Sequence, residues 1–375
     1  LNQGNPFGEP AWMVTLEKDE ETRLVVSCRE LEINWGEFAR ERRGWILDEG
    51  LIDLSHWILD ALDEAGDTLA GRTRILPLLM GYARPSIDPQ RYERGLAMGD
   101  GFGLNYSQTE AFAQAYATDL VYLIQGPPGT GKTRLLAHLA QALVADGERV
   151  LITSFTHRAI NNALNKVMEV DPALPAAKIG QSTRADDLRA DNYETFAASP
   201  MAEMSGGYVL GATPFATRTQ RLEGVEFETV IFDEASQITL PLAVMGMLAG
   251  QKYIFIGDQK QLPPVLTTRL SGGAFRDSVF GSLVERGFDT MLTETYRLSS
   301  ELADWSSRHF YDGQLTPAPW VAGRRVDYSR PPARLIDVLD PDEPKVFWDL
   351  GHRNTTTRSH KEADAVADLI STLLN

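Results

Sequence analysis

Hydrophobic residues in this chain form short unbroken runs, and longer stretches between the runs carry hydrophobic residues at helical spacing. The runs are rich in Val, Ile, Tyr and Phe and lie at residues 121–124, 150–154, 208–211, 230–232 and 253–256. Runs this short and this apolar are typical of strands covered on both faces. One of the helix-like segments covers residues 134–144. The alternation predicts a parallel α/β sheet with helices on both faces, whose ligands bind at the carboxyl ends of the strands.

The first hundred residues follow a different pattern. Residues 11–31 contain two apolar runs around a charged turn at 18–21, which predicts a β-hairpin. Residues 36–67 and 75–82 have helical spacing, and residues 86–103 are rich in Gly and Pro, which predicts a loose boundary. We therefore predict an N-terminal accessory region over 1–103, an α/β domain over 104–290 and the start of another domain over 291–375.

Composition and charge say more about where the protein works than about which reaction it catalyses. The net charge of −16 disfavours a nucleic-acid coat held by charge alone, but not a protein that grips a strand through a local groove of hydroxyls and amides. The single cysteine, Cys28, excludes an internal disulfide or a cysteine-cluster metal site. Residues 1–10 lack an apolar targeting core, and the longest apolar stretch, 240–249, is shorter than the roughly 20 residues that span a bilayer. We expect a cytoplasmic protein without membrane contact.

A complete phosphate-binding loop follows the first predicted strand and precedes a predicted helix. It consists of Gly126, Pro127, Pro128, Gly129, Thr130, Gly131, Lys132 and Thr133. The glycines let the backbone approach a triphosphate, Lys132 brings a positive charge to the outer phosphates, and the Thr133 hydroxyl is suited to Mg²⁺. Strand, loop and helix together predict nucleoside triphosphate binding by these eight residues.

Two adjacent carboxylates, Asp233 and Glu234, come directly after another predicted strand. Behind a phosphate-binding loop, the first carboxylate of such a pair holds the magnesium and the second orients and deprotonates the attacking water. We therefore assign Asp233 to the metal, together with Thr133, and Glu234 to the water. The alternative for the pair is an acidic helix cap without catalytic function.

Two glutamines complete the predicted nucleotide site. Gln261 follows the strand at 253–256, where it can hydrogen-bond the terminal phosphate and sense its loss; the alternative is a polar turn closed by two prolines. Gln108 opens a helix just before the first strand of the sheet. A side-chain amide matches both the donor and the acceptor of the adenine edge, so Gln108 is suited to select ATP.

In this order and on these strands, the motifs resemble a superfamily 1 helicase. The series is the phosphate-binding loop, the Asp-Glu pair, Gly-Asp-x-x-Gln-Leu-Pro-Pro at 257–264 and the leading glutamine. The details are most similar to branch 1B, in particular to the helicase domain of the replication nuclease-helicase family and to the nonsense-mediated-decay RNA helicase. The resemblance implies a P-loop, RecA-like fold for residues 104–290.

The same resemblance implies contacts to a single strand of nucleic acid. Thr156, His157 and Asn161 lie in a segment similar to the family's strand-gripping motif, and Thr213 and Pro214 are implied in the same groove. Hydroxyls and amides at strand ends can bond sugar and phosphate without reading the bases. The alternative is that Thr156 caps the following helix and that Thr213 and Pro214 form a plain loop.

Residues 292–300 resemble the first motif beyond the nucleotide-binding domain, whose arginine reaches the terminal phosphate. Arg297 fits that part because a guanidinium is always protonated; the alternative is a surface salt bridge. Thr295 and Leu298 depart from the usual glutamine and methionine of this motif. No later Gln-Gly or Thr-Arg-Ala element occurs before Asn375, so we expect a truncated second RecA-like domain and a chain that by itself binds ATP without efficient hydrolysis.

The sequence thus predicts an ATP-dependent helicase or translocase that uses ATP and Mg²⁺. The resemblance to branch 1B implies 5'-to-3' movement on single-stranded nucleic acid, with DNA favoured over RNA, in replication or repair, and a possible fused or partner nuclease domain. Two alternatives stay open. One is an RNA helicase of the same branch, and the other is a P-loop ATPase switch that does not move on a strand.

Overall fold

The computed structural model describes residues 14–20, 23–27, 54–264, 278–328, 330–353 and 358–374. The chain divides into two compact units, Leu1–His56 and Trp57–Asn375. In the first, β1 (Thr15–Glu20) pairs antiparallel with β2 (Arg23–Ser27), which confirms the predicted hairpin. The strand β1 runs through most of the predicted turn at 18–21. Residues 11–13 and 28–31 of the predicted hairpin and most of the predicted helical stretch at 36–67 lie outside the described residues.

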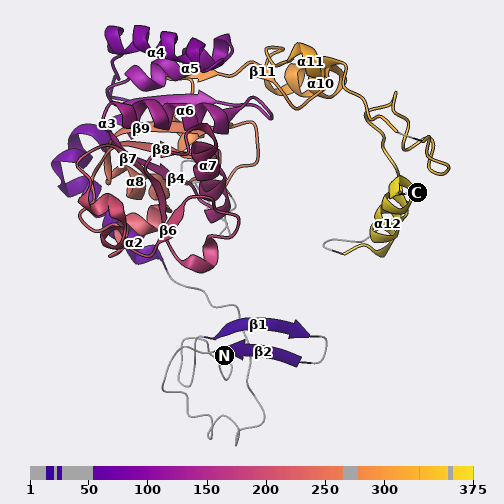
Figure 1. The fold of residues 1–375 in the computed structure, drawn as a ribbon, viewed down its shortest axis with the longest axis horizontal. Helices are drawn as coiled ribbons and strands as arrows, with labels where there is room; N and C mark the ends of the chain where they lie inside the picture. The colour runs from indigo at the N-terminus through magenta and orange to yellow at the C-terminus, as the bar shows by residue number, and fades with distance from the viewer. Residues whose placement is uncertain are drawn as a thin grey trace, which may run out of the picture. The chain divides into compact units, whose positions relative to one another are not determined.

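The second unit is built around one sheet whose eight strands all run parallel (Figure 1). In chain order the strands are β3 (Val121–Gln125), β4 (Arg149–Thr153), β5 (Ala176–Ile179), β6 (Asp191–Tyr193), β7 (Tyr208–Gly211), β8 (Phe227–Phe232), β9 (Gly250–Gly257) and β10 (Asp289–Met291). Their spatial order is β10-β3-β9-β8-β4-β7-β5-β6. The predicted parallel α/β fold is therefore confirmed, and all five predicted strands are present.

The order of the strands places the connecting helices on both faces of the sheet. From β3 the chain moves to β4 and then β5, and from β7 it returns through β8 and β9 to β10. Right-handed crossovers that travel in opposite directions lie on opposite faces. Thus α6 (Lys132–Ala145) and α7 (His157–Val170) cover one face, whereas α8 (Leu240–Met247) and α9 (Val279–Leu283) belong to the other. The chain reverses direction between β3 and β9, and a crevice forms where such a reversal occurs.

The central strands form the hydrophobic core. Every residue of β3 and β7 is buried, and so are the last four residues of β4 and of β8. Phe232 of β8 stacks on Phe255 of β9 with ring centroids 4.6 Å apart. Such continuous apolar strands leave polar side chains at the strand ends, which is where the chemical groups of this chain lie.

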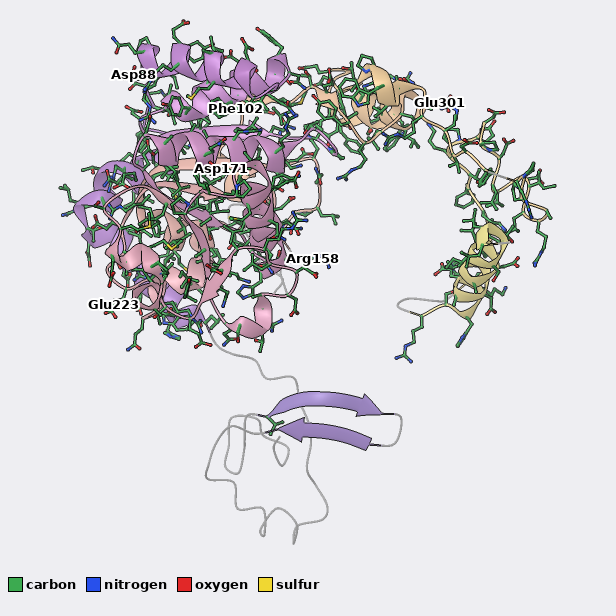
Figure 2. The ribbon with its side chains drawn as sticks, viewed as in Figure 1. Asp88, Phe102, Arg158, Asp171, Glu223 and Glu301 are labelled. Carbon is green, nitrogen blue, oxygen red and sulfur yellow. The ribbon has the colours of Figure 1, made fainter. Side chains whose placement is uncertain are left out.

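The predicted loose stretch at 86–103 is wrong, because most of it forms helix α4 (Pro89–Gly101). The Asp88 carboxylate caps this helix by accepting hydrogen bonds from the next turn, and Asp88 and Phe102 mark its two ends (Figure 2). The glycines permit close packing on α5 (Tyr106–Ala117), since a Cβ at Gly95 would lie 2.7 Å from the Ala113 backbone. They are therefore packing residues, and the three-part domain division stays a prediction.

The remaining elements frame the sheet. Upstream lie α2 (Ser55–Asp67), a π-helical turn (Gly71–Ile75) and α3 (Leu76–Leu79), and the last of these confirms the predicted helix at 75–82. Short 3-10 turns occur at Ser182–Arg184, Phe196–Ala198, Pro200–Glu203, Pro214–Arg218 and Ala235–Gln237. Beyond the sheet, β11 (Glu294–Thr295) pairs in parallel with β12 (Thr316–Pro317), and α10 (Ser300–Phe310), α11 (Pro319–Ala322) and α12 (His360–Leu374) follow. Across the described ranges, none of the helices combines the length and the apolar character that crossing a bilayer requires.

Candidate functional site

The phosphate-binding loop connects β3 to α6 at the crevice end of the sheet. Gly126 donates its backbone N–H to the Gly257 carbonyl at the end of β9, with 2.8 Å between the two atoms. The Lys132 ammonium donates to the Gly126 carbonyl at 2.6 Å, and α6 begins at Lys132 without a side-chain cap. The first N–H groups of α6 therefore point out of the helix without intrahelical partners, as in an anion site at a helix N-terminus.

Glycines in this loop permit contacts that a side chain would prevent. Gly129 and Gly131 have φ values of 77° and 82°, in the left-handed region. A Cβ on Gly129 would lie 2.4 Å from the Arg297 Cβ, and one on Gly131 would lie 2.7 Å from the Gln108 Nε2. The loop is thus enclosed by two residues from distant parts of the sequence that were both predicted for the same site.

Asp233 and Glu234 follow β8, which is next to β9 in the sheet. Asp233 is 5% exposed, and burial raises the pKa of its carboxyl to about 7. The nearby Glu234 raises this pKa further, while the positive charge of Lys132 lowers it. Lys132 and Asp233 therefore lie close enough to interact across the crevice, as the predicted nucleotide site requires.

Glu234 has a backbone conformation that few side chains adopt. Its φ is 51° and its ψ is 42°, a left-handed geometry that costs about 1 kcal/mol or more for a residue other than glycine. It precedes the 3-10 turn Ala235–Gln237, but its side chain makes no capping hydrogen bond. The Glu234 side chain therefore does not act as the acidic helix cap that the sequence left open as an alternative.

Gln261 lies at the surface directly after β9 and next to a buried carboxylate. Its Nε2 donates to Asp258 Oδ2 at 2.8 Å, and its backbone N–H bonds the Asp258 carbonyl. Asp258 is 1% exposed and also accepts from Gln125 Nε2, at the end of β3, at 3.3 Å. The sequence indicates no role for Asp258, although this carboxylate accepts the hydrogen bond that fixes the side chain of Gln261.

Gln108 lies against the phosphate-binding loop, as its position in the sequence predicted. It is 1% exposed; its Nε2 donates to the Thr130 carbonyl at 2.9 Å, and its Oε1 accepts from the Asn105 N–H at 3.0 Å. The second bond completes a capping box at the start of α5. In this structure the amide therefore braces the loop, and its proposed contact with adenine stays a prediction.

The motif at 292–300 contacts the opposite wall of the loop. The buried Thr295 donates its hydroxyl to the Pro128 carbonyl at 2.8 Å, and the Tyr296 N–H bonds the Gly129 carbonyl at 2.8 Å. Thr295 therefore has a definite task, although it replaces the usual glutamine. Arg297 is exposed beside Gly129 and has no salt bridge among the described residues.

Tyr296 is a site residue that the sequence analysis missed. Its hydroxyl accepts from Asn105 Nδ2 at 2.6 Å, and its ring stacks on Trp320 with centroids 5.6 Å apart. The ring thus lies between the loop and the residues before α5. Its position inside a recognised motif was the only signal in the sequence, since nothing there indicates that an aromatic ring reaches Asn105.

The residues predicted to grip a strand differ in their availability. Thr156 is exposed and accepts from the Ala159 N–H at 3.2 Å, so it does cap α7. His157 is half-buried; burial lowers its pKa, and the nearby cations Lys178 and Arg184 lower it further. It is therefore a neutral side chain among positive charges at neutral pH.

Asn161 has a different task from the predicted one. It is 6% exposed, its Nδ2 donates to the Arg184 and Asp186 carbonyls, and its Oδ1 accepts from the buried Lys178. Both ends of the amide are occupied within the protein, so Asn161 braces the loop after β5 and offers little to a strand. The predicted contact of Asn161 with a strand stays a prediction.

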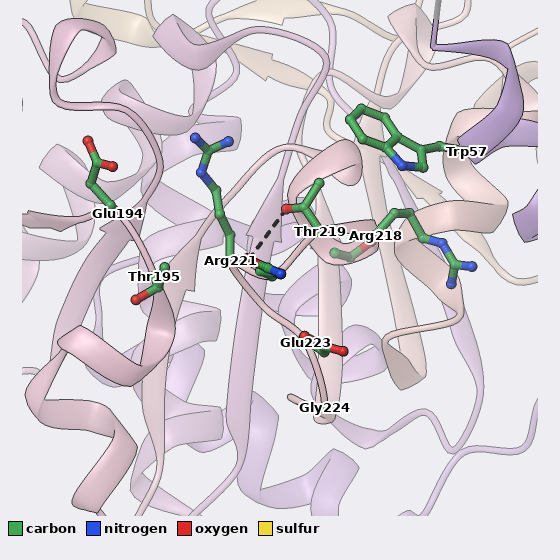
Figure 3. Close-up of a pocket in the computed structure, with 10 residues that line it drawn as sticks. Trp57, Glu194, Thr195, Arg218, Thr219, Arg221, Glu223 and Gly224 are labelled. Atoms are coloured by element: carbon green, nitrogen blue, oxygen red, sulfur yellow. Dashed lines mark hydrogen bonds between the residues drawn. The ribbon is translucent and has the colours of Figure 1, made fainter.

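Thr213 and Pro214 follow β7 and begin the 3-10 turn Pro214–Arg218. Thr213 is half-buried and makes no capping bond, whereas Pro214 is buried. Beyond them lies a hollow of about 770 Å³, in which Trp57 and Arg218 lie to one side and Glu194 to the other (Figure 3). Aromatic, hydroxyl and arginine groups suit a nucleic-acid strand, although carboxylates balance the charge of this hollow.

The groups in the crevice fit Mg²⁺ and a nucleoside triphosphate. Magnesium in such sites is held by one or two protein oxygens together with phosphate oxygens and water. Asp233 supplies a buried carboxylate and Thr133 a half-buried hydroxyl, and in the described part of the chain no three acidic, Cys or His side chains gather into a metal-binding cluster. A divalent cation would also favour the charged form of Asp233, which burial disfavours.

Two family models, each described as an AAA domain, match consecutive parts of this chain. One AAA domain model matches residues 108–267, and a second matches residues 275–375. The first contains the phosphate-binding loop, the carboxylate pair and Gln261, and the second contains Arg297. The boundary between the two matches falls within the predicted first domain, close to its end.

The chain is also similar to curated proteins. The "DNA replication ATP-dependent helicase/nuclease DNA2" of Saccharomyces cerevisiae is 29% identical over 266 residues, which is 65% of this chain and 18% of that protein. The human protein of that name is 29% identical over 275 residues, 65% of this chain and 26% of that protein. This chain therefore spans about a quarter or less of either relative. Among solved structures, the arterivirus nonstructural protein 10 helicase with DNA covers 64% of this chain and 46% of its own at 15% identity, with a TM-score of 0.38.

Proposed function

We propose that this chain, which resembles a superfamily 1 helicase and is similar to the DNA replication ATP-dependent helicase/nucleases, hydrolyses ATP to move along single-stranded DNA. One observation carries the proposal. The loop around Lys132, the buried Asp233 and the arginine motif at 295–297 all lie around one crevice of the sheet, although more than 160 residues separate the first from the last. The branch 1B motifs support 5'-to-3' movement.

Each residue has a separate part in the proposed hydrolysis. The N-terminus of α6 and Lys132 bind the phosphates, Thr133 and Asp233 hold Mg²⁺, and Glu234 orients the attacking water and accepts its proton. The magnesium ion supplies positive charge that stabilises the phosphoryl group during transfer. Arg297 adds a permanent positive charge from the opposite wall, where a Cβ on Gly129 would lie 2.4 Å from the Arg297 Cβ.

Their position after the strand ends supports Thr156, His157 and Thr213 as contacts for the DNA strand: Thr156 is exposed, and His157 and Thr213 are half-buried. All three follow the carboxyl ends of neighbouring strands β4 and β7, so they lie along one edge of the sheet. The strand would then pass close to the hollow around Trp57 and Arg218 (Figure 3). The names of the relatives support a nuclease in the same polypeptide.

Changing Lys132 to Ala in the full-length protein tests the proposal. We expect strand-stimulated ATPase to fall at least about a hundredfold, because a charge-assisted contact to the transferring phosphate is lost. Lys166→Ala is the matched control, since Lys166 pairs with Glu169 on the outer face of α7 and should leave the rate unchanged. An unaltered rate in Lys132→Ala would refute the proposed site.

The same assay separates the alternatives. Stimulation by matched RNA but not by DNA would identify an RNA helicase, and ATPase activity indifferent to either strand would identify a switch without movement. Unwinding of a duplex with a 5' tail but not with a 3' tail is expected, and the reverse result would overturn the proposed direction.

A further inference from the structure

A buried carboxylate links the predicted phosphate sensor to the helix that follows the arginine motif. Asp258 Oδ2 accepts two hydrogen bonds, one from Gln261 Nε2 at 2.8 Å and one from the Tyr311 hydroxyl at 2.7 Å. Its Oδ1 accepts from Gln125 Nε2 and from the Lys260 N–H. Asp258 thus accepts four hydrogen bonds, two at each carboxylate oxygen, and the bonds from Gln261 and Tyr311 share Oδ2.

Tyr311 brings a distant element into this arrangement. It ends α10, where its N–H bonds the Ser307 carbonyl, and it lies 53 residues beyond Asp258 in the chain. Tyr311 is 4% exposed. Burial raises the pKa of the phenol, and the hydrogen bond to Asp258 raises it further, so the hydroxyl stays protonated and acts as a donor.

The two donors on Oδ2 make the positions of Gln261 and Tyr311 interdependent. If the Gln261 amide turns to a terminal phosphate, it leaves Oδ2, and the Tyr311 hydroxyl becomes the remaining donor to that oxygen. A hydrogen bond to a charged oxygen strengthens when a competing donor leaves. Loss of the phosphate returns the amide to Oδ2 and weakens the bond to α10.

We propose that Asp258 and Tyr311 are positioning residues that place Gln261 for the terminal phosphate and transmit its movement to α10. This inference rests on the proposed ATPase and names the contact through which that activity reaches the residues after the sheet. Neither residue contacts the nucleotide. Both act through the amide of Gln261.

Tyr311→Phe in the full-length protein removes only the hydroxyl. We expect the kcat of strand-stimulated ATPase to fall about tenfold with an unchanged KM for ATP, because a hydrogen bond to a charged group of this strength is lost. Tyr122→Phe is the matched control: Tyr122 is also buried, and its hydroxyl shares a 2.8 Å hydrogen bond with Thr290 instead of a carboxylate. The control should retain the wild-type kcat and lose similar thermal stability.

A second pair of variants separates positioning from a purely structural part. In a Gln261→Ala background, Tyr311→Phe should lower kcat no further, because its effect passes through Gln261. Hydrogen exchange gives a readout without turnover. A non-hydrolysable ATP analogue should slow exchange over residues 303–314 in the wild type and in Tyr122→Phe, but not in Tyr311→Phe.

The outcomes distinguish this inference from the proposed function. If the wild-type protein showed no strand-stimulated ATPase, the proposed function itself would be wrong. If the wild type were active but Tyr311→Phe and Tyr122→Phe behaved alike in kcat and exchange, the proposed function would stand and the coupling would be refuted. Equal losses from Tyr311→Phe with and without Gln261 would also refute it.

Discussion

Asp233→Asn should stabilise the folded protein at neutral and alkaline pH while it abolishes ATP hydrolysis. The Asp233 carboxyl is buried at the end of β8, where burial and the neighbouring Glu234 disfavour its negative charge. Asparagine has nearly the same shape and no charge. The substitution therefore removes a cost of the folded state together with the predicted magnesium ligand.

The pKa gives the magnitude and its pH dependence. The carboxyl of Asp233 has a pKa of about 7 in the folded protein, against an ordinary value of 3.8. At 1.36 kcal/mol per unit, the charged form costs about 4 kcal/mol. Because the folded pKa is raised, the folded state binds the proton more tightly. The wild type is thus penalised little at pH 4, progressively more up to pH 7, and fully above it.

Thermal denaturation without nucleotide or magnesium measures this difference. The melting temperature of Asp233→Asn should match the wild type near pH 4 and exceed it by roughly 8 °C at pH 8, at about 2 °C per kcal/mol. The same change at Asp258 is the control: this carboxylate accepts four hydrogen bonds, so Asp258→Asn should destabilise. If the difference in melting temperature between Asp233→Asn and the wild type did not change with pH, the reasoning would be refuted.

Two further predictions concern the loop and the opposite end of the sheet. Gly129→Ala should raise the KM for ATP about tenfold, because the added Cβ would meet Arg297. Gly147→Ala is the control and should leave KM unchanged, because Gly147 also has a positive φ but faces open space. Equal effects of the two substitutions on KM would argue against the close contact. Glu148→Gln should lower the free energy of unfolding by about 3 kcal/mol without altering KM, because Glu148 pairs with the buried Lys252 and with Arg91 of α4. Urea unfolding measures this loss, and an unchanged unfolding midpoint would contradict the prediction.

The strand pattern was sufficient to predict the fold. The five predicted strands are continuous apolar runs, which is the pattern of strands covered on both faces. The three strands that the sequence did not indicate lack it: β5 is four residues long and includes the buried Lys178, and β6 and β10 are short and partly polar. Pairing with neighbours, rather than local preference, makes these segments strands.

The clearest local error in the prediction came from reading glycines as a sign of loose structure. Four glycines at 95, 99, 101 and 103, together with a proline at 89, suggested a loose segment, yet α4 uses Gly95 and Gly99 for close contact with α5. A glycine that permits a turn and a glycine that permits helix contact look alike in one sequence. The hydrogen bonds of Asn161 could not be predicted for a similar reason, since its partners are the backbone carbonyls of residues 184 and 186, which only the fold brings near.

The crevice combines features that are unfavourable for a protein that only has to fold. Asp233 is buried with a disfavoured charge, and Glu234 has left-handed backbone geometry. Across from them, Thr295 and the Tyr296 backbone bond the carbonyls of the phosphate-binding loop. A cation bound at Asp233 would favour the charge that burial disfavours, and would add to the partial compensation that Lys132 already provides. The buried charge of Asp233 and the strained backbone of Glu234 therefore lie where a bound metal and nucleotide would offset their cost. Binding should also favour the arrangement in which the arginine motif contacts the phosphate-binding loop.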